Sequence, residues 1–207
     1  MKERPILFSA PIVRALLDGS KTQTRRAIKP QPIGQYTDDG EDWYVQWKKY
    51  TTDSAEDLDF ACPYGLEGDQ LWVRETHADS TGGNGTVFRA DMTQLPNQRD
   101  QEAHFFFAQH CKIPEAAFKW KPSIFMPRAI SRIQLEITGI RVERLQDISQ
   151  DDAVAEGCKG GHGAMPDYAY NASPDEHFMM LWESINGAGS WNANPWVWVI
   201  EFKRVKP

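Results

Sequence analysis

The sequence predicts an α+β fold, in its simplest form a small mixed β-barrel with two or three flanking helices. Segments with strand character outnumber those with helical character, and the two kinds do not alternate as a parallel α/β fold requires. No internal repeat is visible in the 207 residues, so a repeat architecture is excluded. The length suits a sizeable core, and we expect residues 1–207 to form a single domain with insertions at about 30–67 and 77–120.

Three segments predict the principal strands. Residues 71–76 (LWVRET) follow a turn-forming Gly-Asp pair. Residues 131–144 alternate apolar with polar side chains, which predicts a strand with one buried face and a second strand after Gly139. Residues 196–205 are dense in apolar side chains and predict a further strand. Shorter strands are expected at residues 21–26, 43–47 and 86–89.

Three short helices are expected beside these strands. Residues 11–18 place apolar side chains at helical spacing between a proline and a glycine. Ser149 begins a second helix that Gly157 ends, since a serine followed three residues later by an acid is typical of a capped helix start. Ser173 begins a third helix in the same way, and Gly187 ends it.

The formal net charge of −6 is concentrated in one segment. Residues 37–59 contain eight acidic residues and two lysines, and the rest of the chain balances at 21 acids and 21 bases. Within that balanced part, residues 14–29 and 119–132 are basic. The overall charge excludes a protein that coats nucleic acid, but local anion binding stays open, as does the alternative of ordinary solvated basic faces.

The distribution of apolar residues and cysteines indicates the compartment. No stretch approaches the roughly 18 consecutive apolar residues that a membrane helix needs, so we expect no membrane partner. Pro5 and Pro11 interrupt the first apolar run, which argues against a secretion signal. Cys62, Cys111 and Cys158 are odd in number and widely spaced, which suits a reducing compartment. We therefore expect a cytoplasmic protein.

Common catalytic motifs are mostly absent. The chain has no GxxxxGK[ST] phosphate loop, no GxGxxG after a strand, no GxSxG elbow and no HExxH pair. Its five histidines and three cysteines lack the paired spacing that is typical of zinc sites. We expect neither a metal nor an organic cofactor.

Residues 19–26 (GSKTQTRR) place an amine, hydroxyls and guanidinium groups directly after a predicted helix end. Crowding by Arg25 and Arg26 favours the neutral form of Lys21, which could then act as a base. Thr24 becomes a candidate nucleophile if a base accepts its proton. Positions three apart point to opposite faces of an ideal strand, so Lys21 and Thr24 share a site only if the chain bends between them. The alternative is an exposed basic strand without a catalytic role.

Six segments of the chain together resemble a known family. They are residues 4–9 (RPILFS), 17–26 (LDGSKTQTRR), 68–75 (GDQLWVRE), 144–149 (RLQDIS), 181–186 (LWESIN) and 198–202 (WVIEF). In this order, and over nearly the whole chain, they resemble the ASCH-domain family, most closely its longer members encoded by phages and prophages. The G-x-K-T-x-T-x-R segment is the most specific part. The resemblance implies a PUA-like β-barrel, a fold shared with RNA-binding domains.

The family includes small bacterial enzymes that hydrolyse N4-acetylcytidine to cytidine and acetate with a lysine, a threonine and a glutamate. Lys21 and Thr24 match the first two positions, and Glu156, seven residues after Ser149, matches the third. The resemblance therefore implies an amidohydrolase for acylated pyrimidine nucleosides or nucleotides, with Lys21 as base, Thr24 as nucleophile and Glu156 as acid or base. A phage-encoded enzyme would act in the cytosol of the host cell.

Other members of the family bind RNA, at least one cleaves RNA, and this chain is much longer than the small amidohydrolases. An RNA-binding module without turnover and a metal-independent ribonuclease are therefore the alternatives. Arg25 or Arg26 would lie near a sugar or a phosphate. Trp72 and Trp196 would stack on bases or belong to the core, and Glu75 would contact a base edge or pair with the neighbours of Arg74. The candidate binding residues are Thr22, Arg25, Arg26, Trp72, Arg74, Glu75 and Trp196.

Overall fold

The computed structural model describes residues 1–31, 62–79, 85–91, 118–162 and 171–205, and describes only the backbone of residues 33–36, 43–46, 48–51, 54–57 and 92. Contacts within the chain define two compact units built from interleaved segments. The first contains Met1–Gly19, Gln70–Leu135 and Arg204–Pro207, and the second contains Ser20–Asp69 and Glu136–Lys203. None of the helices in the described ranges combines the length and the apolar character needed to cross a bilayer.

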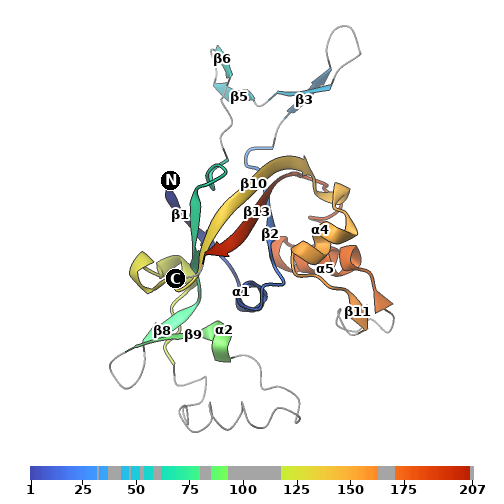
Figure 1. Cartoon of the computed structure of the whole chain (residues 1–207). Coiled ribbons are helices and arrows are strands. Elements are labelled where there is room, and N and C mark those ends of the chain that lie inside the picture. Colours follow the sequence, from blue (N-terminus) through green and yellow to red (C-terminus); the bar gives the residue numbers. More distant parts are fainter. Residues whose placement is uncertain are drawn as a thin grey trace. The chain divides into compact units, whose positions relative to one another are not determined.

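A five-stranded sheet has the order β1-β7-β10-β13-β2 (Figure 1). Its first pair, β1 with β7, is parallel and sets Glu3 opposite Gln70. Its last pair, β13 with β2, is antiparallel and sets Ile200 opposite Thr24. The strands are β1 (Glu3–Leu7), β2 (Gln23–Ala27), β7 (Gln70–Arg74), β10 (Gln134–Arg144) and β13 (Trp196–Val205).

The α+β class is confirmed, whereas the predicted closed barrel is not found in the described part of the chain. β1 and β2 stand at the two ends of the strand order, and the described residues form no pairing between them. Closure requires the two edge strands to pair, and the alternation of apolar and polar residues does not encode which strands do so. The sequence also predicted two strands around Gly139, but β10 runs through that glycine without interruption.

In the first unit, β1 leads into a short amphipathic helix. Val13 and Leu16 are the buried side chains of this helix, and a proline occupies its first turn, where the missing amide proton costs nothing. Gly19, with φ of 78°, follows its end. This unit also contains α1 (Ala10–Leu17), β8 (His77–Asp79), β9 (Thr86–Phe88), α2 (Arg89–Met92) and two short 3-10 helices at Ser123–Phe125 and Arg128–Ile130.

In the second unit, two capped helices pack on a core that β13 helps to form. The Ser149 hydroxyl accepts a hydrogen bond from the Asp152 amide, and Ser173 forms a reciprocal capping box with Glu176, as predicted. The helices are α4 (Gln150–Ala155) and α5 (Pro174–Asn186), and a two-stranded pair joins β11 (Gly161–His162) to β12 (Asn171–Ala172). The buried core residues are Leu145, Ala153, Cys158, Phe178, Trp182, Val197 and Val199.

The two predicted insertions are described only in part. Within the first, the backbone forms two antiparallel hairpins, β3 (Ile33–Tyr36) with β4 (Trp43–Gln46), and β5 (Lys48–Thr51) with β6 (Ser54–Asp57). β4 agrees with the strand predicted at residues 43–47. Within the second, β8 and β9 form a hairpin. The remaining residues of both insertions lie outside the described ranges.

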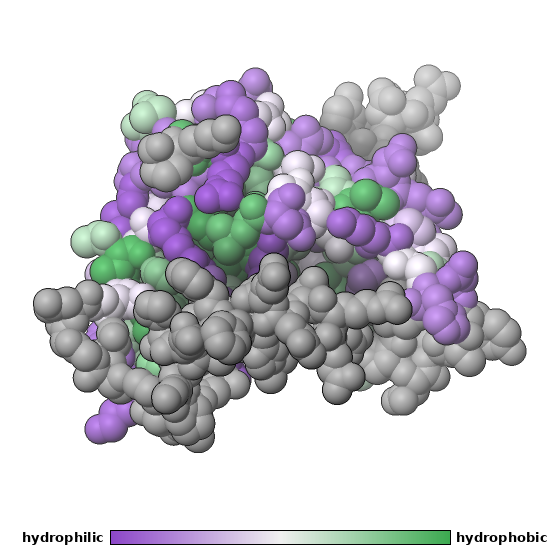
Figure 2. All heavy atoms as spheres, turned by 60° about the horizontal axis from the view of Figure 1, so that its bottom comes forward, coloured by the Kyte–Doolittle hydropathy of each residue, from purple (hydrophilic) through white to green (hydrophobic). Residues whose placement is uncertain are grey.

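Apolar side chains also reach the surface in places. Ile124 and Phe125, between two prolines, are 58% and 71% exposed, and Ile185 near the end of α5 is 54% exposed. On the face shown in Figure 2, separate apolar areas lie among hydrophilic residues.

Candidate functional site

The centre of the candidate site is a buried ion pair between Lys21 and Glu156. Lys21 Nζ lies 2.6 Å from Glu156 Oε2 and also donates a hydrogen bond to the Glu156 backbone carbonyl at 2.8 Å. The two side chains are 1% and 4% exposed. These residues are 135 positions apart in the sequence, and both belong to the second unit. The ammonium and the carboxylate therefore face each other away from bulk water.

The local structure explains why these two side chains meet. Lys21 lies between the turn at Gly19 and the start of β2, while Glu156 is the C-terminal capping residue of α4. The Thr22 amide donates to the Ala155 carbonyl at 2.8 Å, which fastens the segment before β2 to the end of the helix. The last carbonyl groups of a helix lack partners within it and carry partial negative charge, so a lysine is stabilised there.

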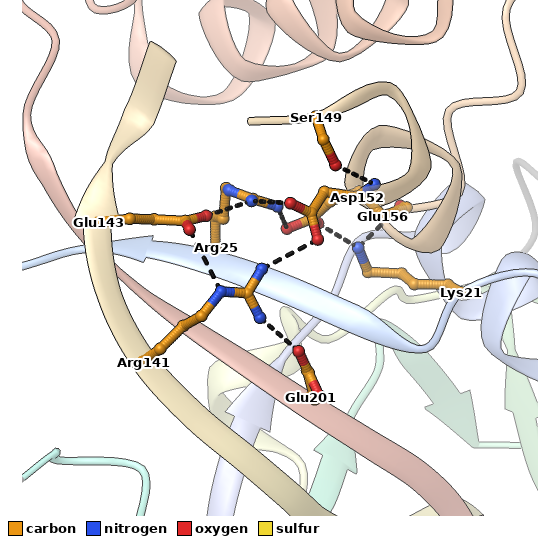
Figure 3. A network of polar contacts seen from close by, with 8 residues as sticks. All are labelled: Lys21, Arg25, Arg141, Glu143, Ser149, Asp152, Glu156 and Glu201. Atoms are coloured by element: carbon orange, nitrogen blue, oxygen red, sulfur yellow. Dashed lines mark hydrogen bonds and ion pairs between the residues drawn. The ribbon is translucent and has the colours of Figure 1, made fainter. Parts of the chain in front are cut away.

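Arg25, two residues into β2, extends the pair into a network (Figure 3). Its guanidinium is completely buried and meets three carboxylates. Nη2 contacts Glu143 and lies 3.2 Å from Asp152 Oδ2, and Nη1 lies 3.5 Å from Glu156 Oε1. The carbon at the centre of the guanidinium lies 5.8 Å from the ring centroid of Phe178. A rigid guanidinium fork suits several carboxylates at once better than a lysine would.

Arg141 on β10 continues the network beyond Arg25. It lies 3.2 Å from Glu143 and 2.9 Å from Asp152, and it also contacts Glu201 on β13. Cations and carboxylates thus alternate from Glu201 to Lys21, as the dashed lines in Figure 3 trace. Because each buried charge has at least one partner of opposite sign, the network avoids the large cost of an unpaired buried charge.

Burial and neighbouring charges change the pKa of several groups here. Burial tends to raise the pKa of Asp152, but the Gln23 side chain, Arg25, Ser149 and Arg141 together lower it below its ordinary value. For Cys158, burial raises the pKa to about 12, with the charge of Lys21 opposing that change and the charge of Glu156 adding to it.

Thr24, the third predicted catalytic residue, is buried in β2 opposite Ile200. Among the described residues, no hydrogen bond joins Thr24 to Lys21 or to Glu156. Gln23 and Arg25 on either side of it both approach Asp152, and alternation along a strand directs the intervening side chain to the other face. The structure therefore brings Lys21 and Glu156 together, and Thr24 lies on the face of β2 opposite to that of Gln23 and Arg25.

The predicted binding residues on β2 and β13 have different surroundings. Thr22 is exposed and Arg26 is partly buried. Burial lowers the pKa of the Arg26 guanidinium, and interactions with Tyr64 and Glu156 oppose this change. Trp196 has the guanidinium of Arg144 4.5 Å from its ring centroid.

The predicted binding residues of the first unit are occupied by internal contacts. The Trp72 ring lies under the guanidinium of Arg74 at 4.6 Å and under that of Arg128 at 6.0 Å. Glu75, 1% exposed, accepts two hydrogen bonds from Arg132, from Nε at 3.0 Å and from Nη2 at 2.8 Å. In this arrangement Glu75 pairs with Arg132, and both of its carboxylate oxygens are engaged.

Sequence reasoning missed four members of the network, namely Arg141, Glu143, Asp152 and Glu201. Their spacing contains a usable pattern. Arg141 and Glu143 are two apart on a strand and share a face, and Asp152 and Glu156 are four apart at a helix and share a side. The spacing does not reveal that this face of β10 and this side of α4 both contact Arg25.

No group of three or more His, Cys, Asp or Glu side chains in the described ranges is arranged to hold a metal ion. Comparison of the chain with protein-family models, with curated proteins and with solved structures finds no match.

Proposed function

We propose that this protein hydrolyses the amide of an acylated pyrimidine nucleoside or nucleotide, of the N4-acetylcytidine type. The observation that supports the proposal is the buried contact of Lys21 with Glu156, because these are two of the three residues that the family resemblance implies. The proposal includes an ASCH-type, PUA-like fold, which the six resembling segments support. These segments lie at least partly in β1, β2, β7, β10, α5 and β13. It also includes a modified nucleoside as the partner and the cytoplasm as the compartment.

The pair offers both a base and an acid without a metal. We propose that the reaction begins with the transfer of one proton from the Lys21 ammonium to the Glu156 carboxylate, across their 2.6 Å contact. The transfer yields a neutral amine and a neutral carboxylic acid. The amine can then accept a proton from a nucleophile, and the acid can donate one to a leaving group.

The proposed reaction has two steps. In the first, Thr24 Oγ1 attacks the acyl carbon while its proton passes to the Lys21 amine, the carbon–nitrogen bond breaks, and Glu156 gives its proton to the departing N4 nitrogen. In the second, water attacks the Thr24 ester, the acid is released, and the hydroxyl proton of Thr24 is restored. Both steps return Lys21 and Glu156 to their charged forms.

This chemistry requires Lys21 to leave Glu156 and approach Thr24 during the reaction. Gly19, at φ of 78°, lies in the turn that precedes Lys21 and permits backbone conformations that other residues rarely adopt. Lysine has a long flexible side chain, so a change of rotamer moves the amine over several ångströms.

The two RNA-based alternatives receive less support from the surface charges. Most basic side chains of residues 14–29 and 119–132 that would meet phosphates are engaged by carboxylates within the protein, which reduces the net positive charge available for counterion exchange. The pairs are Lys21 with Glu156, Arg25 with Glu143, Lys121 with Asp79, Arg128 with Glu3, and Arg132 with Glu75.

The direct test is incubation of the protein with N4-acetylcytidine, with the release of cytidine followed by chromatography. We expect turnover by the unaltered chain and a loss of kcat of about 10⁴-fold in Thr24→Ala, since a missing nucleophile is not replaced. Thr138→Ala, a substitution of the same kind at an exposed position on β10, is the matched control and should leave the rate unchanged.

A labelled RNA oligonucleotide in parallel reactions separates the alternatives. If no cytidine is released and the protein binds RNA with an affinity that falls steeply as the salt concentration rises, the protein is an RNA-binding module and not a hydrolase. If the RNA is cleaved, the protein is a ribonuclease. Full activity of Thr24→Ala would remove the threonine from the chemistry and leave water as the nucleophile.

A further inference from the structure

The two carboxylate oxygens of Glu156 face two different cations. Oε2 lies 2.6 Å from Lys21 Nζ, while Oε1 lies 3.5 Å from Arg25 Nη1. A glutamate at the C-terminal cap of a helix has several rotamers available, and a single contact would leave its carboxylate free to rotate about the terminal carbon–carbon bond. The second cation fixes the plane of the carboxylate and assigns one oxygen to Lys21.

Arg25 is itself held from several sides. Its guanidinium is completely buried, Glu143 and Asp152 engage the nitrogen that does not face Glu156, and the Phe178 ring lies beside it. Glu143 and Asp152 are in turn held by Arg141. Removal of Arg25 would leave Glu143, Asp152 and Glu156 close together with one cation fewer, and they would repel one another.

We infer that Arg25 is a positioning residue, which aligns the Glu156 carboxylate with Lys21 and does not itself meet the substrate. The inference rests on the proposed function of the Lys21–Glu156 pair, and it assigns to Arg25 a role other than the sugar or phosphate contact expected from the sequence. The three carboxylates around this buried guanidinium offset its positive charge, so the cluster as a whole has little attraction for a phosphate.

The first test measures the pair without any reaction. A lysine ammonium that is buried and hydrogen-bonded exchanges its protons slowly enough to give a 15N–1H signal, and the Lys21 signal is identified by its disappearance in Lys21→Met. We expect the signal in the unaltered chain and its loss in Arg25→Gln. Arg144→Gln is the matched control, because Arg144 also stacks on an aromatic ring in the second unit but is not a member of the network. A Lys21 signal that persists in Arg25→Gln, or is missing from the unaltered chain, would overturn the inference.

A milder variant keeps the test usable if Arg25→Gln fails to fold. Asp152→Asn preserves the size of the side chain and removes one of the two carboxylates that anchor Arg25. We expect faster proton exchange at Lys21 in this variant than in the Arg144→Gln control. Equal exchange in both variants would contradict the positioning role.

Kinetics with N4-acetylcytidine then distinguish positioning from substrate binding. A misplacement of about 1 Å costs up to about 100-fold in rate, so Arg25→Lys should lower kcat by roughly that factor and leave KM within the same order of magnitude. Millimolar methylguanidinium should restore part of kcat in Arg25→Ala. A raised KM with an unchanged kcat would show that Arg25 binds substrate. If the unaltered chain has no activity, the proposed function fails, and the exchange measurement still decides whether Arg25 positions Glu156.

Discussion

Lys21 contacts Glu156 through both the carboxylate and the backbone carbonyl of that residue, at 2.6 and 2.8 Å. One ammonium thus joins a side-chain interaction to the end of helix α4. The amide of Thr22 reinforces the same junction through the Ala155 carbonyl. The position of the pair therefore depends on where α4 ends, and substitutions that weaken α4 should disturb the pair even at a distance.

The N-terminal cap of α4 provides one such substitution. In Ser149→Ala the amide of Asp152 loses its acceptor, and we expect the free energy of unfolding to fall by about 1 kcal/mol. Urea denaturation followed by circular dichroism measures the change. Ser184→Ala is the control, because that hydroxyl donates to a carbonyl of its own helix and caps nothing. A control that loses as much stability as Ser149→Ala would contradict the capping role.

The network should make stability depend on pH through Asp152. Its pKa is lowered in the folded protein, so its contribution is present above the unfolded value of about 3.9 and is lost as the pH falls toward the folded value. We expect Asp152→Asn to lower Tm at pH 7, and the difference from the unaltered chain to shrink below about pH 4. Thermal melts at a series of pH values measure this. If the difference in Tm between Asp152→Asn and the unaltered chain instead grew toward acid pH, the result would contradict a lowered pKa for Asp152.

The thiol of Cys158 should be unreactive in the folded protein. It is 1% exposed, and burial raises its pKa to about 12, so the thiolate that attacks alkylating reagents is scarce at neutral pH. We expect iodoacetamide at pH 8 to modify Cys158 only after unfolding in urea, as measured by mass spectrometry of the peptide that contains it. Rapid labelling in the folded state would show that the region between α4 and β11 opens readily.

The Glu75–Arg132 pair should stabilise the first unit. Glu75 is nearly inaccessible, so Arg132→Leu would leave a buried carboxylate without its two donors and cost about 3 kcal/mol. The double variant Glu75→Leu with Arg132→Leu buries no lone charge at this position and should recover part of that loss. Chemical denaturation of the two single variants and the double variant measures the coupling. If the double variant lost as much free energy of unfolding as the two single variants together, the interaction between Glu75 and Arg132 would contribute no stability.

The sequence predicts the elements of this fold better than their assembly. The N-terminal caps at Ser149 and Ser173 and the strand at residues 196–205 follow from local patterns, and the structure confirms them. The closed barrel was wrong for the described residues because closure depends on edge pairing between segments far apart in the chain. Local patterns do not contain that information.

The candidate site was predicted in part. The family resemblance implied Glu156 as a site residue, and the structure sets this residue beside Lys21. Because side chains alternate in direction along a strand, the sequence already predicted that Thr24 points away from Lys21 unless the chain bends between them. The burial of Arg25 was not predictable, because its three carboxylate partners come from β10 and α4, and their approach is a property of the tertiary structure.

A double-mutant cycle on N4-acetylcytidine hydrolysis, with Lys21→Met, Glu156→Gln and their combination, is the most direct test of the proposed proton-transfer pair. If the two side chains act as one unit, each single variant should lose at least about 100-fold in kcat, and the combination should be no slower than the slower single variant. Circular dichroism of each variant checks that it is folded. Losses that multiply in the double variant, or a folded single variant that keeps full activity, would contradict the account.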